Sequence, residues 1–276
     1  ATSVTAAVNN EAWGLVPSNE NGAISVPILP KLKNRYYGLR HGESKANLEG
    51  IISSDYDRGS TIHGLTHKGI TQARQAATDM LGVLSRDAIP SLVVYSSNFT
   101  RARQTAKECV RALERIVNYE NDHLPDKEKI SLDVLIDNRL LERGFGDLDG
   151  TKVTNYNYVW PLDLYDAHHT TFGVESVNDV VARVRELIVD LETRYSDKDI
   201  VLTSHADTLQ IMQCFVAMVD PRQFSQYRFL NAEVRPLLQN PTSLPPPAPL
   251  CKIAPATTLT ESTLPGADSE EYRDEE

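Results

Sequence analysis

Cysteine is scarce in this chain of 276 residues, which contains only Cys109, Cys214 and Cys251. An odd number of cysteines without paired spacing argues against a disulfide framework and favours a reducing compartment, such as the cytoplasm or an organelle stroma. Free cysteine side chains are usually buried and inert. We therefore expect Cys109 and Cys214 to lie in the interior as free thiols.

Long apolar runs and excess positive charge are also missing. The longest apolar stretch, 209–219, is broken and shorter than the ~20 residues that cross a membrane, so we expect a soluble protein without a membrane partner. No arginine precedes Arg35, so the start of the chain does not resemble an Arg-rich transit peptide. The net charge of -10 argues against nucleic acid as a partner, because such binding requires clustered Lys and Arg. The oligomeric state does not follow from the sequence.

The composition divides the chain into three parts. Residues 1–33 mix Asn, Ala, Pro and Ser without a clear period and are predicted to form an N-terminal extension. Residues 34–240 are long enough for one domain with a substantial core. Residues 241–276 are rich in Pro, Ser, Thr and acidic residues, a composition that cannot bury enough apolar surface to offset the entropy of ordering. We therefore expect a disordered, acidic, Pro-rich tail.

Buried strands and amphipathic helices alternate in the central part. Short runs rich in Val, Ile, Leu and Tyr predict strands at 36–39, 92–95 and 200–203. Each run is followed by a polar loop and a helical pattern, and a further helical pattern begins after Ser176, a suitable N-cap. The predicted helices are 69–84, 101–117, 177–191 and 209–219. This order predicts an α/β fold with a mostly parallel central sheet.

Polar side chains follow each of the three predicted strands. Arg40 and His41 follow the first strand, Arg101 follows the second, and His205 follows the third. Ligands of such sheets bind beyond the carboxyl ends of the strands, so we expect these side chains to converge there. A guanidinium matches the oxygens of a phosphoryl group, and an imidazole nitrogen that faces the phosphorus can attack it to form a covalent intermediate.

These residues lie in motifs that resemble those of the histidine phosphatase superfamily, the phosphoglycerate-mutase-like or RHG-motif family. In the family's order, the motifs are Arg40-His41-Gly42-Glu43-Ser44 with Asn47, Ser97 with Arg101-Ala102 and Gln104-Thr105-Ala106, and Ser204-His205. The resemblance covers residues 35–218. It implies a three-layer α/β/α fold and makes residues 34–240 a histidine phosphatase domain.

The resemblance also implies a role for each matching residue. His41 would be the nucleophile that becomes phosphohistidine, and His205 would hydrogen-bond the transferring phosphoryl group. Arg40 and Arg101 would clamp the phosphate, with Asn47 as a further contact. No metal or cofactor is implied, because arginines and histidines meet the charge of the phosphoryl group.

The leaving alkoxide needs an acid to protonate it. The segment 140–146 resembles the family segment that carries this acid and nominates Glu142, although Asp147 and Asp149 lie in the same loop. Ala206 follows the second histidine, where the family often has glycine. We place Ala206 in the phosphate-binding set and expect the extra methyl group to alter packing only.

Two departures from the family favour hydrolysis over mutase activity. Gly144 stands where a mutase would have a histidine, and no basic, Pro-containing segment follows Gly150. We therefore predict a metal-independent phosphomonoester hydrolase that acts on a small phosphorylated metabolite. Phosphoglycerate-mutase-type phosphoryl transfer is the first alternative, and a non-catalytic phospho-ligand-binding protein is the second.

Two histidine pairs and an aromatic stretch allow more than one interpretation. His63 and His67 have the spacing of metal ligands on a helix, but the intervening Gly64 predicts a loop, so we favour no metal. His168 and His169 are either solvated or contact the substrate. The aromatic residues around them, which either form a lid or pack locally, are Tyr156, Tyr158, Trp160, Tyr165 and Phe172.

Overall fold

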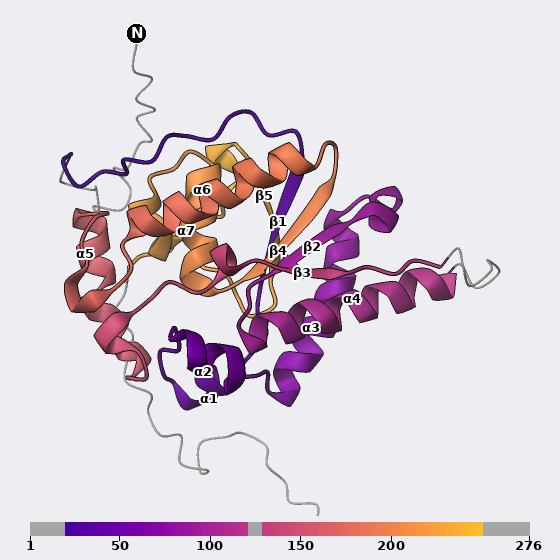
Figure 1. Cartoon of the computed structure of the whole chain (residues 1–276), viewed down its shortest axis with the longest axis horizontal. Coiled ribbons are helices and arrows are strands. Elements are labelled where there is room, and N and C mark those ends of the chain that lie inside the picture. Colours follow the sequence, from indigo (N-terminus) through magenta and orange to yellow (C-terminus); the bar gives the residue numbers. More distant parts are fainter. Residues whose placement is uncertain (1–19, 121–128, 251–276) are drawn as a thin grey trace, which may run out of the picture.

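A five-stranded sheet forms the centre of the domain (Figure 1), as seen in a computed structural model that describes residues 20–120 and 129–250. The strand order is β3-β2-β4-β1-β5, and all neighbours are parallel except the antiparallel pair β1–β5. The strands are β1 Arg35–Arg40, β2 Val93–Ser96, β3 Val134–Ile136, β4 Asp199–Ser204 and β5 Val234–Leu237. The predicted mostly parallel α/β fold is confirmed.

Several of the α-helices begin at side-chain caps that the sequence supplies. Thr66 caps the helix that follows it by accepting from the backbone N–H of Gly69, and Ser176 accepts from that of Asp179. The α-helices are α1 Lys45–Glu49, α2 Tyr56–Thr61, α3 His67–Val83, α4 Thr100–Glu120, α5 Trp160–Tyr165, α6 Val177–Arg194 and α7 Ala206–Val216. The short 3₁₀ helices are η2 Arg86–Ser91, η4 Asn138–Leu140, η5 Gly146–Leu148, η6 Val153–Tyr158, η7 Thr171–Gly173, η8 Pro221–Gln226 and η9 Pro241–Ser243.

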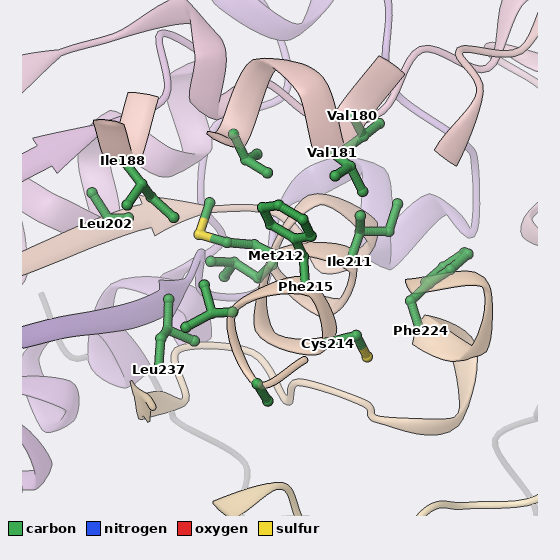
Figure 2. Close-up of a cluster of buried hydrophobic side chains, with 14 of the residues drawn as sticks. Val180, Val181, Ile188, Leu202, Ile211, Met212, Cys214, Phe215, Phe224 and Leu237 are labelled. Atoms are coloured by element: carbon green, nitrogen blue, oxygen red, sulfur yellow. The ribbon is translucent and has the colours of Figure 1, made fainter. Parts of the chain in front are cut away.

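Alternating side chains of the strands supply two hydrophobic cores. Tyr36 and Ile200 pack with α6 and α7, whereas their chain neighbours Tyr37 and Val201 pack with α3 and α4. Figure 2 shows the first of these cores, in which side chains of α7 point toward α6 and the sheet. Helices therefore cover both faces of the sheet, which gives the three-layer arrangement.

The segments that flank the domain lie against it where they are described. The backbone N–H of Ser25 donates to Asn178 Oδ1 at 2.9 Å, and Leu29 is buried in the core with α6. Beyond β5, Leu244 and Leu250 pack on the same core. The predicted disorder therefore does not extend to residues 241–250. The rest of the predicted tail, 251–276, and residues 1–19 lie outside the described residues.

Both described cysteines are buried free thiols, as expected. Burial raises the pKa of Cys109 to about 12 and that of Cys214 well above its ordinary value. Cys251 lies outside the described residues. Within 20–120 and 129–250, no helix combines the length and the apolarity needed to cross a membrane.

A buried ion pair ties the loop after β3 to α5. Both terminal nitrogens of Arg143 donate to the two carboxylate oxygens of Asp163 at 2.7 Å, and neither side chain is exposed to solvent. Arg143 Nε also donates to the backbone oxygen of Glu175 at 2.7 Å. Because Arg143 follows Glu142 directly, this pair fixes the position of the predicted acid.

Replacing Asp163 by Ala should destabilise the folded protein by about 3–5 kcal/mol, because the Arg143 guanidinium would stay buried without its counter-ion. Urea denaturation measures this loss. The exposed pair of Arg111 and Glu108 supplies the control, and Arg111→Ala should cost less than about 1 kcal/mol. Equal losses in the two variants would contradict a structural role for the buried pair.

Candidate active site

The carboxyl ends of β1 and β4 bring two histidines together. Arg40 pairs with Ser204 at the end of the two strands, and the backbone N–H of His41 donates to the Ser204 oxygen at 3.0 Å. The next residue on each chain is a histidine. The ring centroids of His41 and His205 lie 5.1 Å apart, and both rings are buried.

His41 carries its proton on Nδ1. This nitrogen lies 2.7 Å from the backbone oxygen of Gly42, which can only accept a hydrogen bond. Arg101 Nε donates to His41 Nε2 at 3.2 Å. Burial lowers the pKa of His41 well below its ordinary value, and the charges of Arg101 and Arg40 lower it further. The imidazole is therefore neutral with its lone pair on Nε2, which is the form of histidine that attacks phosphorus.

Of the two predicted phosphate clamps, Arg101 is buried and Arg40 is half-buried, and neither pairs with a carboxylate of the described residues. Arg101 donates to the side-chain and backbone oxygens of Ser53 at 3.2 and 2.8 Å, and burial lowers its pKa to about 10. Arg40 Nη1 donates to the backbone oxygen of Phe229 at 2.6 Å, and its buried Nε has no partner. Neither guanidinium forms a salt bridge with a described residue, so both can compensate the charge of a phosphoryl group.

His205 is the N-cap of α7 and lies beside His41 rather than on the cavity wall. Its Nε2 is 2.8 Å from Ser97 Oγ, which accepts a bond from the Phe99 backbone N–H and can donate its own hydrogen to His205. The Nδ1 of His205 is then a buried N–H donor without a hydrogen-bond partner in the part of the chain that the structure describes. Burial lowers the pKa of this histidine well below its ordinary value, so the ring is neutral.

A cavity of about 350 Å³ is lined by His41 and by most of the other predicted site residues. The predicted residues that line it are Arg40, His41, Asn47, Arg101, Glu142 and Ala206. Asn47 uses its amide oxygen to accept from the Ser44 backbone N–H at 3.1 Å in a capping box, so its amide N–H groups are the ones available to a ligand.

Two carboxyl groups line the cavity rather than one. Glu142 Oε1 accepts from the backbone N–H groups of Arg143 and Thr208 at 3.0 and 3.2 Å. Asp207 is 3 % exposed and accepts from Trp160 Nε1 at 3.2 Å. Burial and the nearby Glu142 charge raise the pKa of Asp207 to about 7. Sequence reasoning missed Asp207, because the predicted helix began at residue 209 whereas α7 begins at Ala206.

The other acids of the predicted loop lie away from the cavity. Asp149 pairs with Arg58 and accepts from the backbone N–H of Ser54 at 2.5 Å, so its carboxylate is occupied. Asp147 is exposed in η5. Of the loop acids considered, Glu142 is the one that reaches the cavity.

The aromatic stretch is divided between the cavity wall and the surface. Tyr156 stacks on Trp160 with ring centroids 4.8 Å apart, and both line the cavity. Tyr158, Tyr165 and Phe172 are exposed. The part of the stretch that contains Tyr156 and Trp160 therefore forms one wall of the site, and the rest lies on the surface.

The histidine pairs do not enter the cavity. His63 Nδ1 lies 2.7 Å from Ser53 Oγ, behind Arg101, whereas His67 is exposed at the start of α3. His168 contacts the backbone oxygen of Ala23, and His169 contacts Asp163. In the described part of the chain, no three His, Cys, Asp or Glu side chains gather in a way that could hold a metal ion.

Known proteins share both the sequence pattern and the fold. A 2,3-bisphosphoglycerate-dependent phosphoglycerate mutase of Thermoplasma acidophilum is 30% identical over 56% of this chain, and the match spans 64% of the mutase, less than two thirds of its length. Phosphoserine phosphatase 1 of Hydrogenobacter thermophilus is 26% identical over 70% of this chain and 81% of that enzyme.

The fold is also that of a mycobacterial glucosyl-3-phosphoglycerate phosphatase, with a TM-score of 0.56 at 22% identity over 73% of this chain and 91% of that chain. The model of the histidine phosphatase superfamily (branch 1) matches residues 36–242, which is more than half of the chain. That range contains both histidines and both clamp arginines of the site. The chain belongs to the histidine phosphatase superfamily.

Proposed function

We propose that this protein hydrolyses a small phosphomonoester through a phosphohistidine on His41. The observation that carries the proposal is the neutral His41 imidazole, which lines a cavity together with the guanidinium groups of Arg40 and Arg101. Neither guanidinium has a carboxylate at salt-bridge distance among the described residues. Because no described carboxylate pairs directly with either guanidinium, both can bind the oxygens of a phosphoryl group. The cavity of about 350 Å³ is near the lower end of the range for ligand sites, which supports a small substrate.

The reaction proceeds in two balanced steps. His41 Nε2 attacks the phosphorus, the P–N bond forms, the P–O bond to the leaving group breaks, and the alkoxide takes a proton from Glu142. Water then attacks the phosphohistidine, gives its proton back to Glu142, and releases phosphate as the P–N bond breaks. Arg40 and Arg101 stabilise the charge on the phosphoryl oxygens in both steps. The Nδ1–H of His205 donates to the phosphoryl group once that group is bonded to His41, whose ring lies 5.1 Å from the His205 ring.

Hydrolysis is favoured over mutase transfer by what surrounds Glu142. Arg143 donates its side-chain hydrogen bonds to Asp163 and the Glu175 backbone and does not line the cavity, although its Nη1 lies 3.9 Å from Asp207 Oδ2. Gly144 offers no side chain at the position where a mutase would have a histidine. Mutase transfer remains the alternative, because a mutase stands among the relatives. A purely binding role is disfavoured by the convergence of nucleophile, clamps and acid.

The buried free thiols of Cys109 and Cys214 support a reducing compartment for the protein. Both thiols are buried in the core, where neither is accessible for forming a disulfide bond.

Replacing His41 by Ala should lower phosphate release by at least about 10³-fold, because the covalent nucleophile is lost. Phosphate release from a panel of small phosphomonoesters, with and without a chelator, measures this. His67→Ala is the matched control, since His67 is exposed and lies outside the cavity. Activity that survives His41→Ala would exclude the proposal. Isomerisation of 3-phosphoglycerate that requires a bisphosphate primer and releases no phosphate would favour the mutase.

Glu142→Gln should lower kcat for an alkyl phosphate by about 10²–10⁴-fold, because an alkoxide needs a proton to leave. The loss should be far smaller for 4-nitrophenyl phosphate, whose leaving group departs as an anion. Asp207→Asn, measured beside it, tests whether the second carboxyl shares the proton. Equal losses of Glu142→Gln on the two substrates would contradict its role as the acid.

Asp207 should also make stability depend on pH. In the unfolded chain this carboxyl ionises near its ordinary pKa of 3.8, whereas in the folded protein it keeps its proton up to about 7. Folding therefore takes up a proton between these values, and the stability contribution of the group falls as the pH rises through this window. The Tm advantage of Asp207→Asn over wild type should grow from pH 4 to 7 and level off above.

Thermal melts at pH 4.5, 6 and 8 measure this advantage, with the exposed Asp133→Asn as the control. A constant difference between Asp207→Asn and wild type across the three pH values would contradict a raised pKa for Asp207.

A further inference from the structure

One guanidinium that lines the cavity is not part of the proposed phosphoryl site. Arg228 lines the cavity on the side of Phe229, and its guanidinium carbon lies 4.3 Å from the ring centroid of Trp160. Within the described part of the chain, Arg228 has no carboxylate within salt-bridge distance. The Trp160 ring therefore covers one face of the Arg228 guanidinium. The N–H groups at the edge of the guanidinium stay available to a ligand.

A second donor without a partner lies next to Arg228. Gln210 is 2 % exposed, lines the same cavity, and accepts from the backbone N–H of Phe229 at 3.3 Å through Oε1. That contact fixes the orientation of the amide, since a backbone N–H can only donate. The amide nitrogen Nε2 is then buried, and it has no hydrogen-bond partner among residues 20–120 and 129–250. A buried donor of this kind costs free energy unless a ligand accepts its hydrogen bond.

The two donors are separate from the groups that would hold the phosphoryl. Phe229 lies between the two sets, because its backbone oxygen accepts from Arg40 and its backbone N–H donates to Gln210. The charge of Arg228 is nevertheless close enough to add to burial in lowering the pKa of Arg40. The cavity thus presents a phosphoryl site and an adjoining cationic site.

We infer that Arg228 and Gln210 form a specificity site for a carboxylate on the substrate, so that the protein acts on small phosphorylated carboxylic acids. The inference rests on the proposed function, since it assigns the class of molecule that His41 attacks. Arg228 and Gln210 are specificity residues and take no part in bond breaking.

A carboxylate fits this site better than a second phosphate. A planar guanidinium edge and one amide N–H match the two oxygens of a carboxylate, whereas a phosphate offers three oxygens and a larger charge. Asp207 lies one helical turn before Gln210 on α7 and lines the same cavity, so a dianion there would face a nearby carboxyl group. The volume of about 350 Å³ also limits the distance between the two anionic groups.

The matched substrates 3-phosphoglycerate and glycerol 3-phosphate test the inference, because they differ in a carboxylate against a hydroxymethyl group. The wild type should have a kcat/KM about 10–100-fold higher for 3-phosphoglycerate, as expected from a charge-assisted hydrogen bond. Arg228→Met keeps an apolar stem over Trp160 and should abolish this preference while changing kcat/KM for glycerol 3-phosphate by less than about threefold. Arg111→Met, on the exposed face of α4, is the control.

Gln210→Glu provides a second variant, since it keeps the acceptor for the Phe229 N–H and replaces only the amide N–H donor. It should weaken the preference in the same direction, and a thermal melt checks that the variant is folded. Equal kcat/KM of the wild type for the two substrates would overturn the inference and leave hydrolysis intact. A higher kcat/KM for a short alkanediol bisphosphate would overturn it as well.

Binding separates this inference from the proposed function. Calorimetry on the His41→Ala variant should show about 10–100-fold tighter binding of 3-phosphoglycerate than of glycerol 3-phosphate, and Arg228→Met in that background should remove the difference. If phosphate release fails for every substrate while this difference is seen, the proposed hydrolysis is wrong and the carboxylate site stands. If release is His41-dependent and the difference is missing, the carboxylate site is wrong.

Discussion

The parallel pairing of β1 with β4 is the constraint on which the site depends. Its register sets Arg40 opposite Ser204, and the following residues are the two histidines whose rings lie 5.1 Å apart. The register is held by the cores, because alternate strand residues such as Tyr36 and Tyr37 belong to opposite layers. A shift by one residue would exchange these layers, so the hydrophobic pattern that stabilises the sheet also aligns the histidines.

Burial away from water then sets the protonation state of the titratable groups at the site. The same burial that keeps His41 and His205 neutral raises the pKa of Asp207 to about 7. Arg40 and Arg101 lie in the same site and have no carboxylate at salt-bridge distance among the described residues. Burying uncompensated cations is costly, and the cost is relieved only when an anion binds. The proposed affinity for phosphoryl groups is therefore a consequence of packing as much as of the motif.

The sequence predicted the parts of the structure that combine strong periodicity with a recognisable motif. The strands that carry Arg40 and Ser204 are buried apolar runs, and α6 has a continuous apolar face. Strand β3 is short and largely exposed, and β5 contains Pro236, which is tolerated because β5 is an edge strand. Neither has the pattern of a buried strand. The sequence did not indicate Arg228 as a site residue, because its place in the cavity comes from tertiary packing on Trp160 and not from any local motif.

The cavity is lined partly by residues at strand ends and partly by residues in irregular segments. This difference explains why the sequence motifs indicate the reacting groups but not the substrate. His41 and His205 stand at the ends of regular strands, whose geometry is set by backbone pairing. Glu142 and Arg228 lie in irregular segments that are held by individual contacts, among them the buried pair of Arg143 and Asp163. Such segments can change without disturbing the sheet. The fold thus fixes the position of the proposed nucleophile, whereas the proposed substrate contacts depend on the interactions that position the loops.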